Sequence, residues 1–522
     1  KKHSLVGLAG FSIEKYESDG LGASGSGFPD DQVLTNLNSA AKKNSISSSY
    51  SSNTLASFLS RLEYKFNNRY LLTLNFRADG SSQFGPDKRW GYFPSGAVAW
   101  IITEENFMKD YSNIVSYLKL RGSVGKTGSQ NLGAYDWRTL MGSATYNGAA
   151  GIVPSSLGND ILQWEEQIQK EVGLDYGFWD DRIRGTLGYY QKKVDNLLYS
   201  DPVPTSSSFS SVYQNIGSLK NRGIEFDVRV DIIKNAPKDL TWNVDFNIAR
   251  NRTTLEKLNS SDGYFGGGAY DYFKIEEGGE TGRFYGYKDA GRLFMTNEEL
   301  VGLKTIDPKT GTLKYYRDDY NYERQGDVYI MDLDGDGQIT ADGDRTVIGN
   351  ANPDFFGGFG STLYWKGLML NAVFSYSVGG DRFWDEEKNS SGDMNVYNTS
   401  NRILDSWTVN PGVNASYPRA MYYGWGSNSI ITDRYIHDAS YLRMTALNLS
   451  YRLPKHLYKN SILNAVEFTF QATNLFTWTK YPGMDPQGNF STTYSAFYNM
   501  GIDYSTYPSA RTYNFGIKLT LK

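Results

Sequence analysis

Two neighbouring segments, residues 223–233 and 240–251, alternate apolar and polar side chains over a length that few soluble strands reach. Their polar positions include Glu225, Asp227, Arg229, Asn243 and Asp245. Side chains on a β-strand point alternately to opposite faces, so the pattern predicts a hairpin with one apolar and one charged face. About ten alternating residues is what a tilted strand needs to cross a bilayer, with the apolar side toward lipid and the polar side toward an aqueous lumen.

The same unit recurs along all 522 residues. We expect about fourteen strands, at residues 3–14, 54–66, 69–79, 91–102, 117–126, 165–177, 182–199, 214–233, 240–251, 355–365, 368–379, 439–453, 463–476 and 510–522. Turns as short as 67–68 and 366–367 alternate with long connections, of which the longest are 15–53, 127–164, 252–354, 380–438 and 477–509. This alternation predicts an all-β, antiparallel up-and-down transmembrane barrel with short periplasmic turns and long extracellular loops.

Composition removes several other classes of protein. The chain has no Cys and three His, which excludes disulfides, thiolate catalysis and a credible zinc site. A net charge of −4 leaves no basic footprint for nucleic acid. The longest plain apolar run is residues 97–102, too short for a transmembrane helix.

Two motifs invite an enzymatic interpretation and do not support it. Residues 122–127 (Gly-Ser-Val-Gly-Lys-Thr) lack the first Gly of a phosphate loop, because Leu120 stands there, and no helix is expected to follow. The adjacent carboxylates at 165–166 and 180–181 cannot flank one sugar, because neighbours on a strand face opposite ways and the second pair lies in a predicted turn. We therefore expect no catalytic residues.

A set of short motifs resembles a known family. Residues 74–85 read Leu-Asn-Phe-Arg-Ala-Asp-Gly-Ser-Ser-Gln-Phe-Gly, and residues 89–96 read Arg-Trp-Gly-Tyr-Phe-Pro-Ser-Gly. Further motifs stand at 61–64, 120–130, 164–165 with 173–175, 221–225, 332–337 with 344–349, 474–477 with 480–486, and 510–516. In this order, over nearly the whole chain, they resemble the C-terminal barrel portion of the SusC/RagA-like TonB-linked (TonB-dependent) outer-membrane transporters of Bacteroidetes.

The resemblance implies that residues 1–522 are part of a 22-stranded barrel of the plugged class. The chain begins at Lys1 without a signal peptide, and we expect a signal peptide, an N-terminal extension, a plug domain and the first strands to belong to a longer protein. By resemblance, the protein would sit in the bacterial outer membrane, among its lipids. It would draw energy from the TonB complex and pair with a SusD-like lipoprotein, and two such pairs would be able to form a dimer.

An acidic loop predicts a structural Ca²⁺ site. Three aspartates alternate before a Gly, as in the opening of an EF-hand loop, but the closing Glu is missing and position 343 is Gly. Asp342 or Asp344 must close the site instead, and we expect Asp344 because it begins the Asp-Arg-Thr-Val-Ile-Gly run at 344–349. An acidic turn that binds nothing tightly is the alternative. The predicted ligands are Asp332, Asp334, Asp336, Gln338 and Asp344.

Aromatic residues in two long loops are the predicted ligand contacts. Flat rings stack on sugars and also suit protein interfaces, and the alternative is that they pack the loops on each other or form a membrane belt. The candidates are Tyr264, Phe265, Tyr270, Tyr272, Phe273, Tyr422, Tyr423 and Trp425.

Two functions remain open at this point. The first is an active importer. Oligosaccharides are the preferred cargo and peptides the alternative, because the polar strand faces would form hydrogen bonds with either. The second is a soluble extracellular carbohydrate-binding β-protein. A soluble sandwich has no reason to alternate long and short loops in this way. The importer is favoured, chiefly by the set of motifs that resembles the transporter family.

Overall fold

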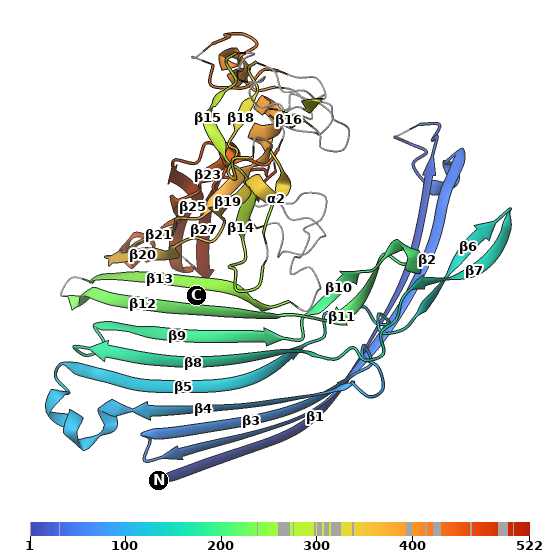
Figure 1. Cartoon of the computed structure of the whole chain (residues 1–522). Coiled ribbons are helices and arrows are strands. Elements are labelled where there is room, and N and C mark those ends of the chain that lie inside the picture. The colour runs from blue at the N-terminus through green and yellow to red at the C-terminus, as the bar shows by residue number, and fades with distance from the viewer. Residues whose placement is uncertain are drawn as a thin grey trace.

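The computed structural model contains one large antiparallel sheet of fourteen strands, each paired with its neighbours in chain order. It describes residues 2–30, 32–236, 239–258, 272–274, 276–296, 299, 305–306, 313–314, 325–336, 339–392, 399–412, 415–420, 428, 430–459, 462–488, 500–504 and 506–521. The sheet curves into an open wall, with extra hairpins and a group of loops standing beyond one end of its strands (Figure 1).

The strands of the wall match the predicted set one for one. They are β1 (His3–Ser26), β2 (Lys42–Phe66), β3 (Tyr70–Ser81), β4 (Trp90–Ile101), β5 (Val115–Ser129), β8 (Glu165–Phe178), β9 (Ile183–Asp195), β12 (Ser218–Ala236), β13 (Leu240–Lys257), β20 (Phe355–Trp365), β21 (Leu368–Val378), β24 (Tyr441–Arg452), β25 (Leu463–Thr479) and β27 (Thr512–Leu521). The connections alternate between short and long as predicted, except that residues 82–89 between β3 and β4 form a shorter connection than residues 102–114 between β4 and β5. We call the two ends of the wall the turn side and the loop side.

Local chemistry explains the tightest turns. Asn67 and Asn68 both have positive φ, at 52° and 57°, and join β2 to β3. Lys366 and Gly367, at 46° and 87°, join β20 to β21. Positive φ at both central residues matches the right-handed twist of the flanking strands, and Asn and Gly tolerate that conformation best.

The two faces of the wall follow the alternation in the sequence. Register places Leu174, Leu187, Phe226 and Ile248 in one row on one face, which we call the outer face. One residue along each strand, Asp175, Thr186, Asp227 and Asn247 form a row on the opposite face, which we call the lumen face. A slip of one residue would exchange the two sets, so the apolar pattern specifies the register.

The segment 15–53, predicted as a loop, is mostly strand. β1 and β2 continue past the membrane-length part and pair with each other up to Ser26 and Lys42. The alternation stops in this Ser- and Gly-rich extension, so the apolar pattern carries no strand signal there, while backbone pairing continues without it.

The predicted strands 182–199 and 214–233 needed a smaller correction. Asn196 (φ 56°) and Gly217 (φ 80°) interrupt them. Beyond these residues β10 (Leu198–Pro202) and β11 (Ser211–Asn215) form a separate hairpin. Another hairpin, β6 (Leu140–Tyr146) with β7 (Ala149–Ser156), lies within the predicted loop 127–164.

The loops after β13, β21 and β25 pack into a common structure, which we call the loop domain. It contains the strands β14 (Arg283–Tyr287), β15 (Asp289–Leu293), β16 (Thr305–Ile306), β17 (Leu313–Lys314), β18 (Val328–Ile330), β19 (Arg345–Asn350), β22 (Asp381–Trp384), β23 (Ile436–Asp438) and β26 (Ile502–Asp503). Its short helices include α2 (Ala341–Asp344) and α3 (Asp385–Glu387). β22 pairs with both β23 and β26, so the last two long loops share one small sheet.

Buried side chains concentrate in this domain rather than in the wall. One cluster surrounds Phe284, Phe383 and Tyr435, and another surrounds Phe294 and Ile330. No helix among the described residues is long and apolar enough to cross a membrane.

Candidate functional site: the lumen face and the loop domain

Charged side chains on the lumen face form a ladder of cross-strand pairs. Lys119 Nζ of β5 lies 3.0 Å from Asp175 Oδ2 of β8, and Arg121 Nε lies 3.2 Å from the other oxygen of the same carboxylate. Arg121 also pairs with Glu171. Cross-strand neighbours on one face are close enough for such pairs, so most of these charges neutralise each other.

The ladder continues onto β9 and β12. Arg184 Nη1 lies 2.9 Å from Asp231 Oδ2, and the Thr186 hydroxyl bonds the Asp227 carboxylate. Asn221 donates to Thr253 Oγ1 of β13 at 2.6 Å. The result is a continuous polar surface of amides, hydroxyls and paired charges on one side of the wall.

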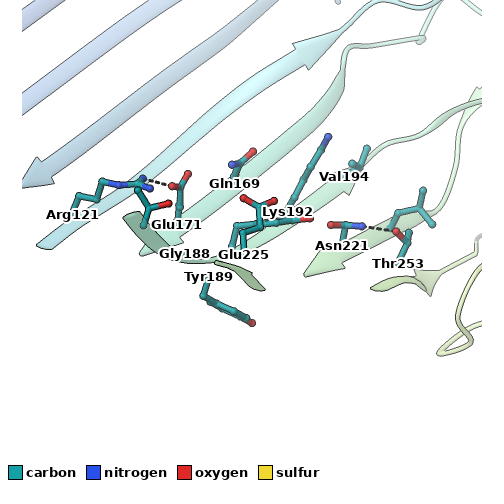
Figure 2. Close-up of a pocket in the computed structure, with 13 residues that line it drawn as sticks. Arg121, Gln169, Glu171, Gly188, Tyr189, Lys192, Val194, Asn221, Glu225 and Thr253 are labelled. Atoms are coloured by element: carbon teal, nitrogen blue, oxygen red, sulfur yellow. Dashed lines mark hydrogen bonds and ion pairs between the residues drawn. The ribbon is translucent and has the colours of Figure 1, made fainter. Parts of the chain in front are cut away.

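A cavity of about 550 Å³ opens on this face toward the loop side. Figure 2 shows Arg121 bonded to Glu171 and Asn221 bonded to Thr253 at its edges, while the ring of Tyr189 points away from the polar groups. The lining residues are Arg121, Gln169, Glu171, Thr186, Gly188, Tyr189, Tyr190, Lys192, Val194, Leu219, Asn221, Glu225 and Thr253.

The adjacent carboxylates of Glu165 and Glu166 have separate partners. Glu166 pairs with Lys126 Nζ at 2.5 Å, whereas Glu165 accepts the N–H of Leu198. Residues 122–127 lie wholly within β5, with no helix after them, as the sequence predicts.

Two of the predicted loop aromatics lie inside the loop domain. Tyr272 and Phe273 are only 4% and 3% exposed. The Tyr272 hydroxyl donates to Asp385 Oδ1 at 2.8 Å, and the ring of Phe273 stacks on Phe284 with centroids 5.0 Å apart. These two rings hold the loops together, as in the packing alternative. The remaining candidates, Tyr264, Phe265, Tyr270, Tyr422, Tyr423 and Trp425, lie outside the described residues.

Three of the predicted metal ligands come together. Asp332, Asp334 and Asp344 each offer a carboxylate oxygen, and these oxygens lie within 4.8 Å of one another. Asp344 is fully buried, and it accepts the N–H groups of Leu333 and Thr340, each at 2.7 Å, which fixes its orientation. Asp336 is exposed, and Gln338 lies outside the described residues.

The crowding of these carboxylates affects the pKa of Asp334. The N–H of Asp336 lowers the pKa of Asp334, but desolvation and the negative charges of Asp336 and Asp344 outweigh it and raise the pKa above 3.8. A hard divalent cation bound by oxygen ligands would relieve this repulsion, so the residues present fit Ca²⁺.

A buried ion pair attaches the last long loop to the wall. Arg443 of β24 and Asp485 in the loop after β25 are 4% and 5% exposed, and their side chains meet at 2.5 Å. Arg443 also donates to Thr477 Oγ1 and Gln487 Oε1. Burial raises the pKa of Asp485, but hydrogen bonds from Arg443 and from two backbone N–H groups bring it below its usual 3.8.

A sequence profile described as "TonB dependent receptor-like, beta-barrel" matches residues 3–475. The chain belongs to this family. The family consists of receptors and transporters rather than enzymes, and it places the chain in the bacterial outer membrane, crossed by strands. The resemblance inferred from the motifs is confirmed.

Individual members agree with this assignment. The chain is 32% identical to TonB-dependent receptor P3 of Formosa agariphila, over 99% of this chain and 50% of that protein. It is also 32% identical to TonB-dependent receptor SusC of Bacteroides thetaiotaomicron, over 90% of this chain and 44% of that protein. The chain thus spans about half the length of the curated relatives it matches.

Solved TonB-dependent barrels give the same fold. The structure of the RagAB peptide transporter superposes with a TM-score of 0.78 and 27% identity, over 99% of this chain and 53% of that one. The peptide importer in its "open-open" state matches with a TM-score of 0.77.

Sequence reasoning named the polar positions of β12 and β13 but not the rest of this site. Arg121, Tyr190 and Lys192 enter the cavity from β5 and β9, which are separate from β12 in the sequence. The same period-two alternation, applied to β5 and β9 and combined with strand pairing, would have predicted these residues on the lumen face.

Proposed function

We propose that the protein is the barrel of an active outer-membrane nutrient importer. The observation that supports this most is the division of the wall between an apolar outer face and a lumen face of polar groups and paired charges. Such a barrel has no energy source of its own. In this proposal the energy comes from the TonB complex, through the part of the longer protein that carries the plug.

The proposed cargo is a glycan oligosaccharide. The charges of the ladder are largely satisfied by each other, so the wall presents balanced hydrogen-bonding groups rather than a field of one sign. A neutral, hydroxyl-rich solute matches such a surface. Tyr190, which lines the cavity, adds a ring of the kind that stacks on sugars.

A peptide is the second candidate, favoured by the likeness to the RagAB peptide transporter. Peptide amides can use the same donors and acceptors. Charged peptide termini would also compete with the ladder for Arg121 or Glu171, so a peptide importer would open these pairs on binding.

We propose a SusD-like surface lipoprotein as the partner on the loop side, with two transporter–lipoprotein pairs as the larger assembly. The β1–β2 and β6–β7 hairpins extend on that side (Figure 1) and offer exposed surface, both polar and apolar, to such a partner. This pairing would place the lipoprotein above the cavity on the lumen face.

We also propose that Asp332, Asp334 and Asp344 hold a structural Ca²⁺, with Asp336 and Gln338 completing the site. The ion would brace the loop that carries α2 and β19 and would take no part in transport chemistry. The converging oxygens and the fixed orientation of Asp344 support this proposal.

The test is purification of the full-length protein from outer membranes in mild detergent, without boiling, followed by mass spectrometry of whatever remains bound. A co-purifying lipoprotein with an oligosaccharide is the expected result. Bound peptides would move the protein to the second candidate. Recovery of the protein alone from the soluble fraction, without detergent, would overturn the importer.

A further inference from the structure

The outer face changes from apolar to cationic within one row of residues. On its loop side the apolar row ends at Val172 of β8, Tyr189 of β9 and Ile224 of β12, which are opposite one another in the sheet. The next outward-facing row, two residues farther along each strand, contains Lys170, Gln191, Arg222 and Arg252. Arg250 lies opposite Ile224, at the height of the last apolar row.

We call the apolar rows of the outer face the apolar belt, and the polar rows beyond them on the loop side the polar band. Cations in the rows farther from the apolar belt have carboxylate partners. Lys126 lies 2.5 Å from Glu166, Lys193 lies 3.0 Å from Asp195, and Lys220 lies 3.1 Å from Glu256. In the row next to the apolar residues, Arg252 also has a partner, because it lies 3.1 Å from Asp354. These ion pairs neutralise the named cations of the polar band.

Three cations next to the belt have no such partner. Within the described part of the chain, Lys170, Arg222 and Arg250 make no ion pair, and all three are exposed. Arg222 is directly opposite Arg252, but the carboxylates that balance Arg252 are Asp354 and Glu280, and neither pairs with Arg222. The unneutralised charge is therefore concentrated where the belt meets the polar band.

An apolar groove begins at the same place. A hollow of about 720 Å³ on the outer face is bounded by Leu74, Val98 and Val172, with Lys170 at its edge. A second hollow, of about 560 Å³, continues toward Trp100. The two share Leu72, Val98, Gly122 and Val172, so they form one groove. Gly122 contributes no side chain, which leaves the groove open.

We propose that this sector of the outer face binds a phosphorylated glycolipid of the extracellular leaflet, with its phosphate at Lys170 and Arg222 and an acyl chain in the groove. Ammonium and guanidinium groups form strong charge-assisted hydrogen bonds with phosphate, and Arg does so in a bidentate manner. Basic residues at a membrane surface each attract anionic lipid appreciably.

The long loops lie on the extracellular side of such barrels, so the three cations face the outer leaflet, where the phosphorylated amphiphile is a glycolipid. The proposal depends on this orientation in the membrane and is independent of the transported cargo.

The test uses the full-length transporter, delipidated in neutral detergent and incubated with diphosphorylated lipid A or with its dephosphorylated form. Native mass spectrometry measures the lipid retained. We expect the diphosphorylated form to be retained preferentially. The double variant K170Q/R222Q should weaken retention by roughly thirty-fold, from the loss of two cations near the surface.

Two further variants separate charge from shape. G122L fills the groove and leaves the cations in place, and a Cβ there would meet nothing closer than the Glu171 backbone oxygen at 3.8 Å. It should also weaken retention. K193Q, in the same polar band but already paired with Asp195, should retain the lipid as the unmodified protein does.

Three results would overturn the proposal. They are equal retention of dephosphorylated lipid A, equal retention by K170Q/R222Q, and displacement of lipid A by an equal concentration of phosphatidylglycerol, which would assign the site to an anionic phospholipid. Gel mobility before and after heating identifies correctly folded barrels, and only these are compared.

Discussion

Arg443 on β24 and Asp485 in the loop after β25 form an ion pair of 2.5 Å from which solvent is almost excluded. The pair connects the transmembrane wall to a segment that contributes β26 to the loop domain. Removing one partner of a buried pair leaves the other charge unsatisfied, which costs far more than the pair itself contributes.

We therefore expect Arg443→Ala to destabilise the docking of this loop by about 3 to 5 kcal/mol. The measurement is the rate at which a protease cleaves the segment 480–511 in the folded barrel. Lys15→Ala, which removes an exposed pair with Glu17, is the control and should leave the rate unchanged. Equal cleavage rates in the two variants would show that the ion pair does not hold the loop.

The same pair predicts a pH dependence. The pKa of Asp485 is lowered below 3.8 in the folded protein, so its contribution to stability is complete above the unfolded value and is lost as the pH falls through the folded value. Cleavage of the loop should stay constant from neutral pH down to about 4 and rise only below it. An acid-stable protease provides this measurement, and a rise already between pH 7 and 5 would contradict the assignment.

Tyr190 and Tyr189 are neighbours on β9 that face opposite sides of the wall. Tyr190→Ala should weaken cargo binding by about 1 kcal/mol, roughly five-fold in Kd, because it removes a ring from the lumen face. Tyr189→Ala should leave the Kd unchanged, because that ring points away from the cavity (Figure 2). Titration calorimetry with the co-purified cargo compares them, and equal effects would place the cargo elsewhere.

Phe226 and Asp227 test the assignment of the two faces in the same way. Phe226→Arg places a charge on the apolar outer face and should cost about 2 to 4 kcal/mol near the bilayer midplane. Asp227→Asn, on the lumen face, should assemble normally. The fraction of folded barrel, measured by gel mobility without heating, should fall only for the first variant.

The acidic loop should retain about one Ca²⁺ per chain. Asp344→Asn should abolish retention, because it removes the buried carboxylate that faces Asp332 and Asp334. Asp342→Asn, at an exposed position in the same helical turn, is the matched control and should retain the ion. Metal analysis by mass spectrometry distinguishes them, and no bound ion in the unmodified protein would favour the simple acidic turn.

The sequence alone determined the strands of the wall, their order and their faces. Period-two alternation is a local property that survives any arrangement of the loops, and a bilayer imposes it over the full length of each strand. For the same reason, alternation gave no strand prediction for the β1–β2 extension. Water covers both faces of that extension, so Ser or Gly can occupy either face of the strands.

Only the tertiary structure decided what the loops and the cross-strand charges do. The burial of Tyr272 and Phe273, the joining of the last two long loops through β22, and the pairing of Arg443 with Asp485 depend on contacts between segments far apart in the chain. Whether a cation such as Lys126 or Arg222 has a partner depends on register between strands. A single strand shows which way its side chains point, and the neighbouring strands decide what they meet.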